Sequence, residues 1–207
     1  MKSEFTVMQL AVGGFDHNFS YLVFAENGDA ALVDPCGDTT IIHAATKDAP
    51  VRLTPKYILL THGHRDHISG MDEVKKFFPA KLMAHPASAV GEITALTDHQ
   101  HLPFGSSFIE TLFTPGHSND SICYHLADDS ALFTGDTLFI DCCGYCNPKE
   151  MFHSLRKIIY PLADSNIVYS GHDYGRTPFA ALREEKRLNP YLYTADYLQF
   201  LEQIKKL

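Results

Sequence analysis

The sequence has no excess of positive charge, because 17 lysines and arginines stand against 25 aspartates and glutamates and the formal net charge is −8. Nucleic acids and anionic membranes attract basic surfaces, so neither has electrostatic support as a partner. No run of 18 apolar residues is present, and residues 1–5 lack the apolar segment of a secretion signal. We therefore expect a cytoplasmic protein without a nucleic-acid or membrane partner.

The sequence also lacks the even number of spaced cysteines that a disulfide framework uses. The five cysteines are an odd number, and Cys142, Cys143 and Cys146 lie close together. This pattern is typical of reduced thiols rather than of a disulfide framework. The Cys-x-x-Cys pair leaves a secondary metal or redox site as an alternative, whereas Cys36 and Cys123 are predicted to be small core residues beside strands.

Breaks in composition are missing as well, since no repeat or low-complexity linker interrupts the 207 residues. Apolar residues make up 45% and charged residues 20%, which is typical of a globular protein. We therefore predict one domain over residues 1–207. The oligomeric state is left open between monomer and homodimer.

Short apolar stretches between turn residues predict a strand-rich chain with interspersed helices. Strands are expected at 5–10, 18–24, 30–34, 57–60, 81–84, 107–114, 121–126, 131–134 and 167–170. A first helix is expected from the N-cap Asp38 to about Lys47, and a second from the stretch that begins at Ile68 to Phe78. Further helices are expected over 150–160, 176–188 and 194–206. Residues 87–106 are the least regular part, and only a helical piece near 87–95 is predicted there.

Four potential metal ligands, His62, His64, Asp66 and His67, fall within six residues directly after the apolar strand 57–60. A loop after a buried strand is a usual place for chemistry, because the scaffold beneath it is rigid. Imidazole and carboxylate are ligands that borderline divalent metals prefer. His62 and His64 alternate along the chain and face one point, whereas Asp66 and His67 follow the turn and face a second point.

Three further ligands each follow a glycine at the end of a predicted strand, namely His117, Asp136 and His172. Glycine lets the backbone turn sharply and approach other groups closely. Each Gly-His or Gly-Asp pair is weak evidence alone, because a structural turn explains it equally well. Together with the cluster at 62–67, they give seven ligands in four loops, which predicts a metal site.

The series His62-x-His64-x-Asp66-His67, Gly116-His117, Gly135-Asp136 and Gly171-His172 resembles the motifs of the metallo-β-lactamase fold superfamily. Three stretches, Gly135–Phe139, Gly171–Tyr174 and Glu185–Pro190, are similar to its glyoxalase II-like (hydroxyacylglutathione hydrolase-like) branch. The resemblance implies an α/β fold, a four-layer αββα sandwich of two mixed β-sheets flanked by helices. It also places the metals at one edge of the two sheets.

The resemblance further implies how the ligands divide. One site would use His62, His64 and His117, and the other would use Asp66, His67 and His172, with Asp136 bridging both. We expect two divalent metal ions. Zinc is the expected metal, and iron or a zinc–iron pair are the alternatives. Two such ions about 3.5–4 Å apart can share a hydroxide and polarise a carbonyl oxygen.

This chemistry suits hydrolysis of a small-molecule thioester, because a thiolate leaves without strong acid assistance. The predicted catalytic residues are Asp136, as the bridge, and Asp66, which can orient water or accept its proton if one metal site is empty. One alternative is a persulfide dioxygenase with a single iron on His62, His117 and Asp136, acting on glutathione persulfide. A second is a binding protein on a degenerate fold.

Two departures from the glyoxalase II pattern concern the substrate side. The chain ends at Leu207 after one or two helices, so we expect most of the family's glutathione-binding helical domain to be missing. Where relatives carry a cation after Cys-Gly, the chain reads Cys143-Gly144-Tyr145. The predicted substrate-binding residues are Cys143, Gly144, Tyr145 and Tyr174. Acyl-glutathione and other acyl thiols are both candidate substrates, and the lost cation predicts that thioesters of other carriers, such as coenzyme A or a carrier protein, are turned over at least as well as acyl-glutathione. Five other histidines are predicted to be structural or surface residues, namely His85, His99, His101, His125 and His153.

Overall fold

The computed structural model describes residues 4–207 and contains two six-stranded sheets that lie face to face. The first sheet takes all its strands from the first half of the chain, in sequence order: β1 Phe5–Gly13, β2 Asn18–Ala25, β3 Asp29–Val33, β4 Thr54–Leu59, β5 Lys81–Ala84 and β6 Thr94–Ala95. Strands β1 to β3 are antiparallel, and β3 to β6 are parallel. This sheet is therefore mixed.

The second sheet takes its strands from the second half, again as sequential neighbours: β7 His101–Phe104, β8 Ser107–Phe113, β9 Ile122–Leu126, β10 Ala131–Gly135, β11 Ile167–Ser170 and β12 Ala180–Ala181. Only the β10–β11 pair is parallel. Each half of the chain thus builds one complete sheet.

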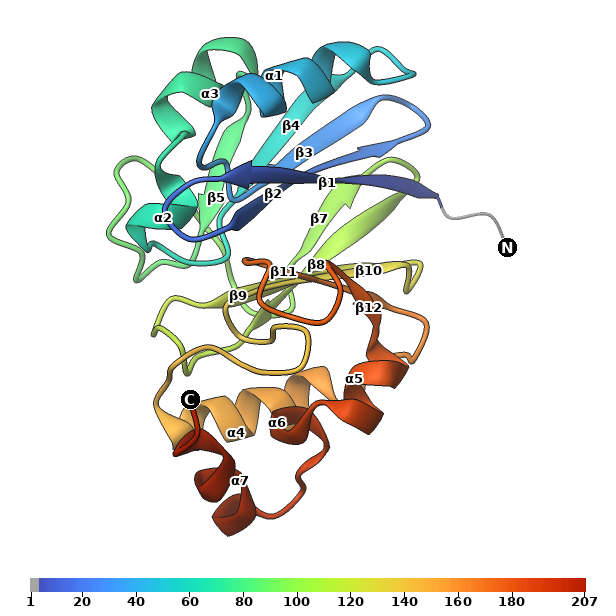
Figure 1. The fold of residues 1–207 in the computed structure, drawn as a ribbon. Helices are drawn as coiled ribbons and strands as arrows, with labels where there is room; N and C mark the ends of the chain where they lie inside the picture. The colour runs from blue at the N-terminus through green and yellow to red at the C-terminus, as the bar shows by residue number, and fades with distance from the viewer. Residues whose placement is uncertain (1–3) are drawn as a thin grey trace.

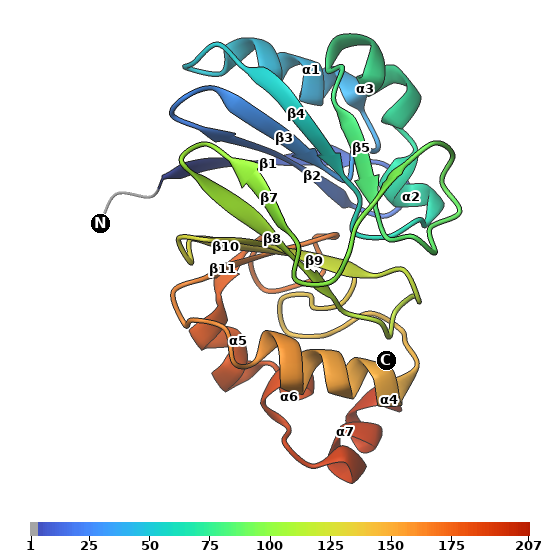
Figure 2. The same ribbon diagram turned by 180° about the vertical axis from the view of Figure 1, so that it is seen from behind.

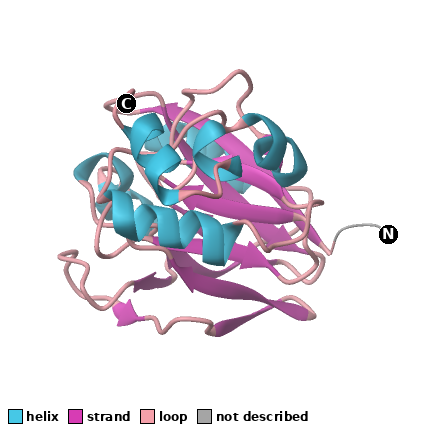
Figure 3. Cartoon of the chain, turned by 90° about the horizontal axis from the view of Figure 1, so that it is seen from below, coloured by secondary structure: helices cyan, strands magenta, loops and turns pink. Residues whose placement is uncertain are grey.

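Helices cover the outer face of each sheet (Figures 1 and 2). The first half supplies α1 Thr39–Asp48, α2 Arg65–Ile68 and α3 Met71–Phe77. The second half supplies α4 Pro148–His153, which continues as the π-helix η1 Ser154–Ile159, and then α5 Leu182–Leu188, α6 Pro190–Tyr193 and α7 Tyr197–Ile204. Seen from below, the second group of helices lies across the sheet beneath it (Figure 3). The predicted four-layer αββα sandwich is confirmed.

The alternation of side chains along the strands explains the layers. All eight residues of β2 are buried, because Tyr21 and Val23 pack between the sheets while Leu22 and Phe24 pack against α1 and its neighbours. A third apolar cluster joins the second sheet to α4, η1 and the C-terminal helices. Within residues 4–207 no helix combines the length and the apolar content needed to cross a bilayer.

Most predicted elements are present, including the Asp38 N-cap, whose side chain accepts from the amide of Thr40. The helical piece predicted at 87–95 was wrong. Amides there turn back onto His85, and Thr94 pairs with Met83 to form β6. The strand β7 within 87–106 was not predicted.

The helix predicted at 176–188 is confirmed only for α5, from Leu182 onward. The amide of Arg176 donates to Asp141, and Ala180 pairs with Val168 in the sheet. The backbone before α5 therefore makes these bonds in place of helical ones. The helix predicted at 194–206 is confirmed as α7, and the short helix α6 before it was not predicted.

Candidate metal centre

All seven predicted ligands lie at one edge of the sandwich, in the segments that follow strands β4, β8, β10 and β11; Asp66 and His67 belong to the short helix α2 after β4, and the others lie in loops. Two glycines allow these loops to meet. A Cβ atom on Gly171 would collide with Oδ1 of Asp136 and lie 2.6 Å from Cε1 of His67. A Cβ atom on Gly144 would collide with the carbonyl oxygen of Asp136 and lie 2.8 Å from Nδ1 of His117. Both positions therefore require a residue without a side chain.

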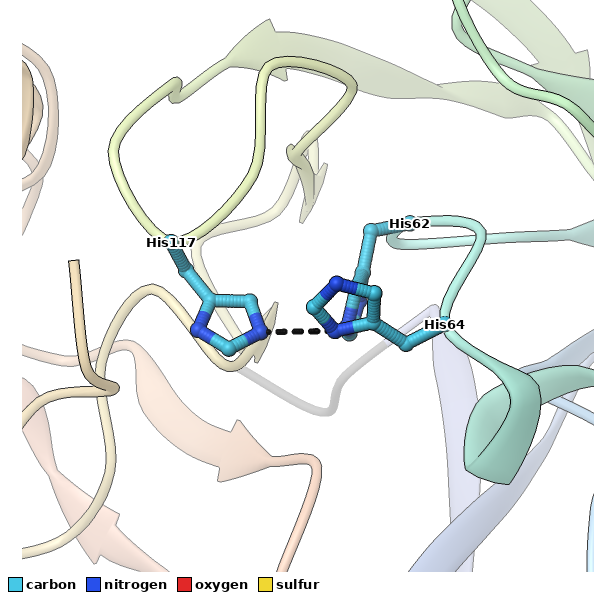
Figure 4. A group of neighbouring side chains, drawn as sticks. All are labelled: His62, His64 and His117. Atoms are coloured by element: carbon cyan, nitrogen blue, oxygen red, sulfur yellow. Dashed lines mark hydrogen bonds between the residues drawn. The ribbon is translucent and has the colours of Figure 1, made fainter. Parts of the chain in front are cut away.

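Three histidines form the first ligand group (Figure 4). Nδ1 of His64 lies 3.0 Å from Nε2 of His62 and 2.9 Å from Nε2 of His117. His62 is buried, His117 is partly buried, and His64 lies at the surface. His62 and His64 face one point, as their spacing predicted, and His117 joins them from a second loop, as the resemblance implied.

The second group consists of Asp66, His67 and His172. Nε2 of His67 lies 3.2 Å from Nε2 of His172, and Oδ2 of Asp66 lies 3.3 Å from each of these atoms. Because His67 and His172 are buried, the open side of this group is at Asp66.

Asp136 lies between the two groups. Its Oδ2 is 3.5 Å from Nε2 of His117 and 3.4 Å from Nε2 of His172, while its Oδ1 is 3.2 Å from Nε2 of His67. Oδ1 is buried and has no hydrogen-bond partner among the described residues. A buried carboxylate oxygen without a hydrogen bond has a large desolvation cost, which a bound cation would offset.

The outward ring nitrogens determine which atoms face inward. Nδ1 of His117 lies 2.9 Å from the carbonyl oxygen of Tyr145, and Nδ1 of His172 lies 2.7 Å from that of Asp16. A carbonyl oxygen only accepts, so Nδ1 must carry a proton in both rings. In the neutral imidazole, Nε2 then presents a lone pair to the centre, as a metal ligand requires.

Asp34 does the same for the other two buried rings. Its Oδ2 accepts from Nδ1 of His67 at 2.9 Å and from Oγ1 of Thr61 at 2.6 Å, and its Oδ1 accepts from the amide of Thr61. Because the Thr61 hydroxyl donates its only hydrogen bond to Asp34, its oxygen can only accept a hydrogen bond from Nδ1 of His62, 3.1 Å away. His62 and His67 therefore also direct Nε2 inward.

The electrostatics favour a bound cation. Burial lowers the pKa of His62 and of His117, so both rings are neutral near pH 7. Burial raises the pKa of Asp136, but the adjacent rings of His172 and His67 outweigh it and hold the pKa well below its usual range. This set of imidazoles and carboxylates fits a divalent metal ion.

Residues outside the motifs support the ligands and were missed in the sequence. Asp34 is buried with a positive φ of 47°, Nδ2 of Asn18 donates to Asp66 at 3.1 Å, and Oδ2 of Asp120 accepts from the amide of Gly63 at 2.9 Å. The available signal was the Asp34-Pro35 pair at the end of a strand that runs beside β4. A polar residue there lies next to the first ligand loop.

The predicted substrate-binding residues lie beside the centre. Tyr145 is 83% exposed, while Cys143 and Gly144 are buried. Tyr174 stacks on His172 with ring centroids 4.8 Å apart, and its hydroxyl donates to the carboxylate of Asp16. Whether these residues contact a substrate stays a prediction.

The remaining cysteines and histidines lie apart from the ligand groups. In residues 4–207, no cysteine belongs to a group of three ligand atoms within 4.8 Å. The buried thiols of Cys36 and Cys123 pack in the apolar clusters, as predicted. His125 lies 2.9 Å from Asp129 and 3.5 Å from Glu110, contacts that fit the predicted structural role.

Comparisons with known proteins agree with this geometry. A model of the metallo-beta-lactamase superfamily matches residues 13–97 and 91–172. A probable hydroxyacylglutathione hydrolase of Schizosaccharomyces pombe is 33% identical over 171 residues, which cover 79% of this chain and 67% of that protein. The probable polyketide biosynthesis zinc-dependent hydrolase PksB of Bacillus subtilis is 28% identical over 186 residues, covering 84% of this chain and 81% of that protein.

Among solved structures, the crystal structure of ETHE1 from Myxococcus xanthus superimposes with a TM-score of 0.84 at 27% identity, covering 97% of this chain and 90% of that one. The fold, the ligand arrangement and the sequence matches therefore lead to one conclusion. The chain is a hydrolase and belongs to the metallo-beta-lactamase superfamily.

Proposed function

We propose that the chain hydrolyses acyl thioesters at the seven-ligand centre with the help of two divalent metal ions, and that these ions are zinc. The observation that carries this proposal is the position of Asp136, whose carboxylate reaches ligand atoms of both groups. Similarity to hydroxyacylglutathione hydrolases supports the reaction, and similarity to a zinc-dependent hydrolase supports the metal.

The residues of the chain have distinct roles in this reaction. His62, His64 and His117 would hold one ion, Asp66, His67 and His172 the other, and Asp136 both. When bound, the ions supply a hydroxide nucleophile at neutral pH and polarise the acyl carbonyl.

When the second ion is absent, Asp66 is the candidate for proton transfer. Its side chain is partly exposed, and the hydrogen bond from Asn18 fixes the carboxylate where it can accept a proton from water. The thiol carrier leaves as a thiolate, so no protein acid needs to face the leaving group.

We further propose that carriers other than glutathione serve this enzyme at least as well as glutathione does. The resemblance to the glyoxalase II branch implies a cation where Tyr145 stands, and three of the chain's other cations are engaged elsewhere. Arg156 donates to the carbonyl of Leu192, Arg176 pairs with Asp141 and Glu185, and Lys186 pairs with Asp164.

The test compares kcat/KM for one acyl group on glutathione and on pantetheine. A missing charge-assisted hydrogen bond costs about 1.5–3 kcal/mol, a roughly 10- to 150-fold effect. We expect pantetheine thioesters to be turned over at least as well as glutathione thioesters, and Tyr145→Arg to gain only for glutathione. A wild type whose kcat/KM is tenfold higher for the glutathione thioester, with no gain in Tyr145→Arg, would refute the proposal about the carrier.

A single-iron oxygenase is the second candidate, because His62, His117 and Asp136 also present two imidazoles and a carboxylate in one place. Strict anaerobiosis separates the two reactions. A thioester hydrolase continues, since water supplies the oxygen atom, whereas an oxygenase stops. Oxygen uptake on glutathione persulfide, with no turnover of any thioester, would replace the proposed function.

A further inference from the structure

A cavity of about 350 Å³ lies outside the metal centre, where α7 meets α4 and η1. Figure 1 shows α7 on the side of α4 that faces away from the second sheet. The cavity is lined by Lys149, Phe152, His153, Arg156, Lys157 and Tyr197. Its lining contains three cations and no carboxylate, although the chain as a whole carries a net charge of −8.

The cations are placed to receive an anion. Lys149, His153 and Lys157 follow one another at helical spacing and share one face of the helical segment. Lys149 and Lys157 are exposed, and neither ammonium group has a partner within residues 4–207. The guanidinium of Arg156 is fixed over the ring of Tyr160 at 3.8 Å and by its bond to Leu192.

The cavity also has an aromatic wall. The rings of Phe152 and Tyr197 lie with centroids 5.3 Å apart, and Phe152 packs on the buried Phe200 at the same distance. A planar ring bound beside Tyr197 would cover apolar surface, while the lysines would meet phosphate charges. This combination of donors and rings fits a phosphorylated nucleoside.

The cavity and the metal centre are joined by one segment. The carbonyl of Tyr145 holds His117, and the amide of Asn147 donates to the carbonyl of Gly116 at 2.8 Å. From Asn147 to His153 the α-helical part rises about 9 Å, at 1.5 Å per residue, and η1 extends the segment to Lys157. A ligand that reaches from the metals into the cavity must therefore be long, with the thioester at one end and the charged ring system at the other.

We propose that this cavity binds the adenosine phosphate end of coenzyme A, with the pantetheine arm running along α4 to the metal centre. The assignment rests on the proposed thioester hydrolysis and names its carrier. Glutathione has neither a ring nor a phosphate to place in the cavity.

The first test measures binding of adenosine 3′,5′-bisphosphate to the metal-loaded protein by calorimetry. Lys149→Glu/Lys157→Glu should weaken binding at least tenfold, because attraction becomes repulsion. Lys75→Glu/Lys81→Glu, two exposed lysines elsewhere, carries the same change in net charge and should bind as the wild type does. Equal binding by the two double variants would overturn the proposal.

The second test uses kinetics. The double variant at 149 and 157 should raise KM for an acyl-coenzyme A at least tenfold, with kcat unchanged and with both constants unchanged for the acyl-pantetheine. Tyr197→Ala should weaken the bisphosphate more than it weakens inorganic phosphate. A wild type with the same KM for both thioesters would refute the cavity assignment and leave thioester hydrolysis intact. A KM effect seen only with an acidic acyl-carrier protein would replace the nucleotide with a protein surface.

Discussion

At the scale of single residues, Asp34 connects three backbone and side-chain donors to the ligand loop. It is 2% exposed and accepts from the amide of Thr61, the hydroxyl of Thr61 and Nδ1 of His67. Each buried donor left without an acceptor costs about 1–3 kcal/mol. Its carboxylate therefore stabilises both the fold and the orientation of the histidines.

We predict that Asp34→Ala lowers the free energy of unfolding by about 3 kcal/mol or more and weakens metal binding about 10- to 100-fold. Urea denaturation and competition with a chelator measure the two effects. Asp48→Ala, which removes an exposed carboxylate at the end of α1, serves as the control. Unchanged metal affinity in Asp34→Ala would show that the histidines hold their orientation without it.

His172 gives a prediction about protons. Burial opposes its charged form, but hydrogen bonds to Asp136 and Asp66 outweigh burial and raise its pKa to about 9 in the absence of metal. The ring therefore carries a proton below pH 9 that a metal ion must displace, and metal affinity falls as the pH falls. We expect at least one proton released per chain at pH 7.5, measured by calorimetric titration in buffers of different ionisation enthalpy. Heats that are independent of the buffer would contradict this.

How much of the centre the sequence could predict is also decided residue by residue. His62, His64 and His67 were recognisable because their spacing in one loop is itself a signal, and Asp136 and His172 because each follows a glycine after a strand. Asp34 was not, since its role depends on the parallel pairing of β3 with β4, and that pairing joins segments more than 20 residues apart. Supporting residues of this kind require the fold.

At the scale of elements, the loop 140–147 sets the position of the first ligand group. The amide of Gly144 donates to the carbonyl of Asp136, and the next residue holds His117 through its carbonyl. We predict that Gly144→Ala displaces His117 and reduces metal content and kcat at least tenfold. Gly91→Ala is the matched control, because nothing lies within 4 Å of a Cβ atom at Gly91. Metal analysis and turnover at saturating substrate measure both variants.

The elements that the sequence misassigned share a physical cause. Helix-forming side chains dominate only from Ala180 onward, after Thr177 and Pro178, and because Ala180 pairs with β11 the helix begins only at Leu182. The two-residue strands β6 and β12 have too few residues to show an alternating pattern. By contrast, longer strands such as β2 and β8 carry their own pattern and were predicted to within about two residues.

At the scale of the whole molecule, the metal centre joins two halves that each build one sheet. Four ligands come from the first half and three from the second. We predict that removing metal with a chelator lowers the unfolding temperature by about 5–10 °C, because free metal at 100 times its dissociation constant stabilises the fold by about 2.7 kcal/mol. Scanning calorimetry measures the shift. Asp136→Ala should show a much smaller one, and an equally large shift in this variant would place the stabilising metal elsewhere.

The separation of the ligands along the chain also has a consequence for biosynthesis. His67 and His172 are neighbours in space but 105 residues apart, so at about 5–20 residues per second the ribosome needs roughly 5–20 s to supply the second after the first. During that interval the loop at 62–67 is an open chelator that exchanges its ion freely. We expect ribosome-bound chains stalled after residue 160 to lose metal to a weak competitor, and released full-length chains to retain it. Equal retention by both would mean that the early loop alone captures the ion.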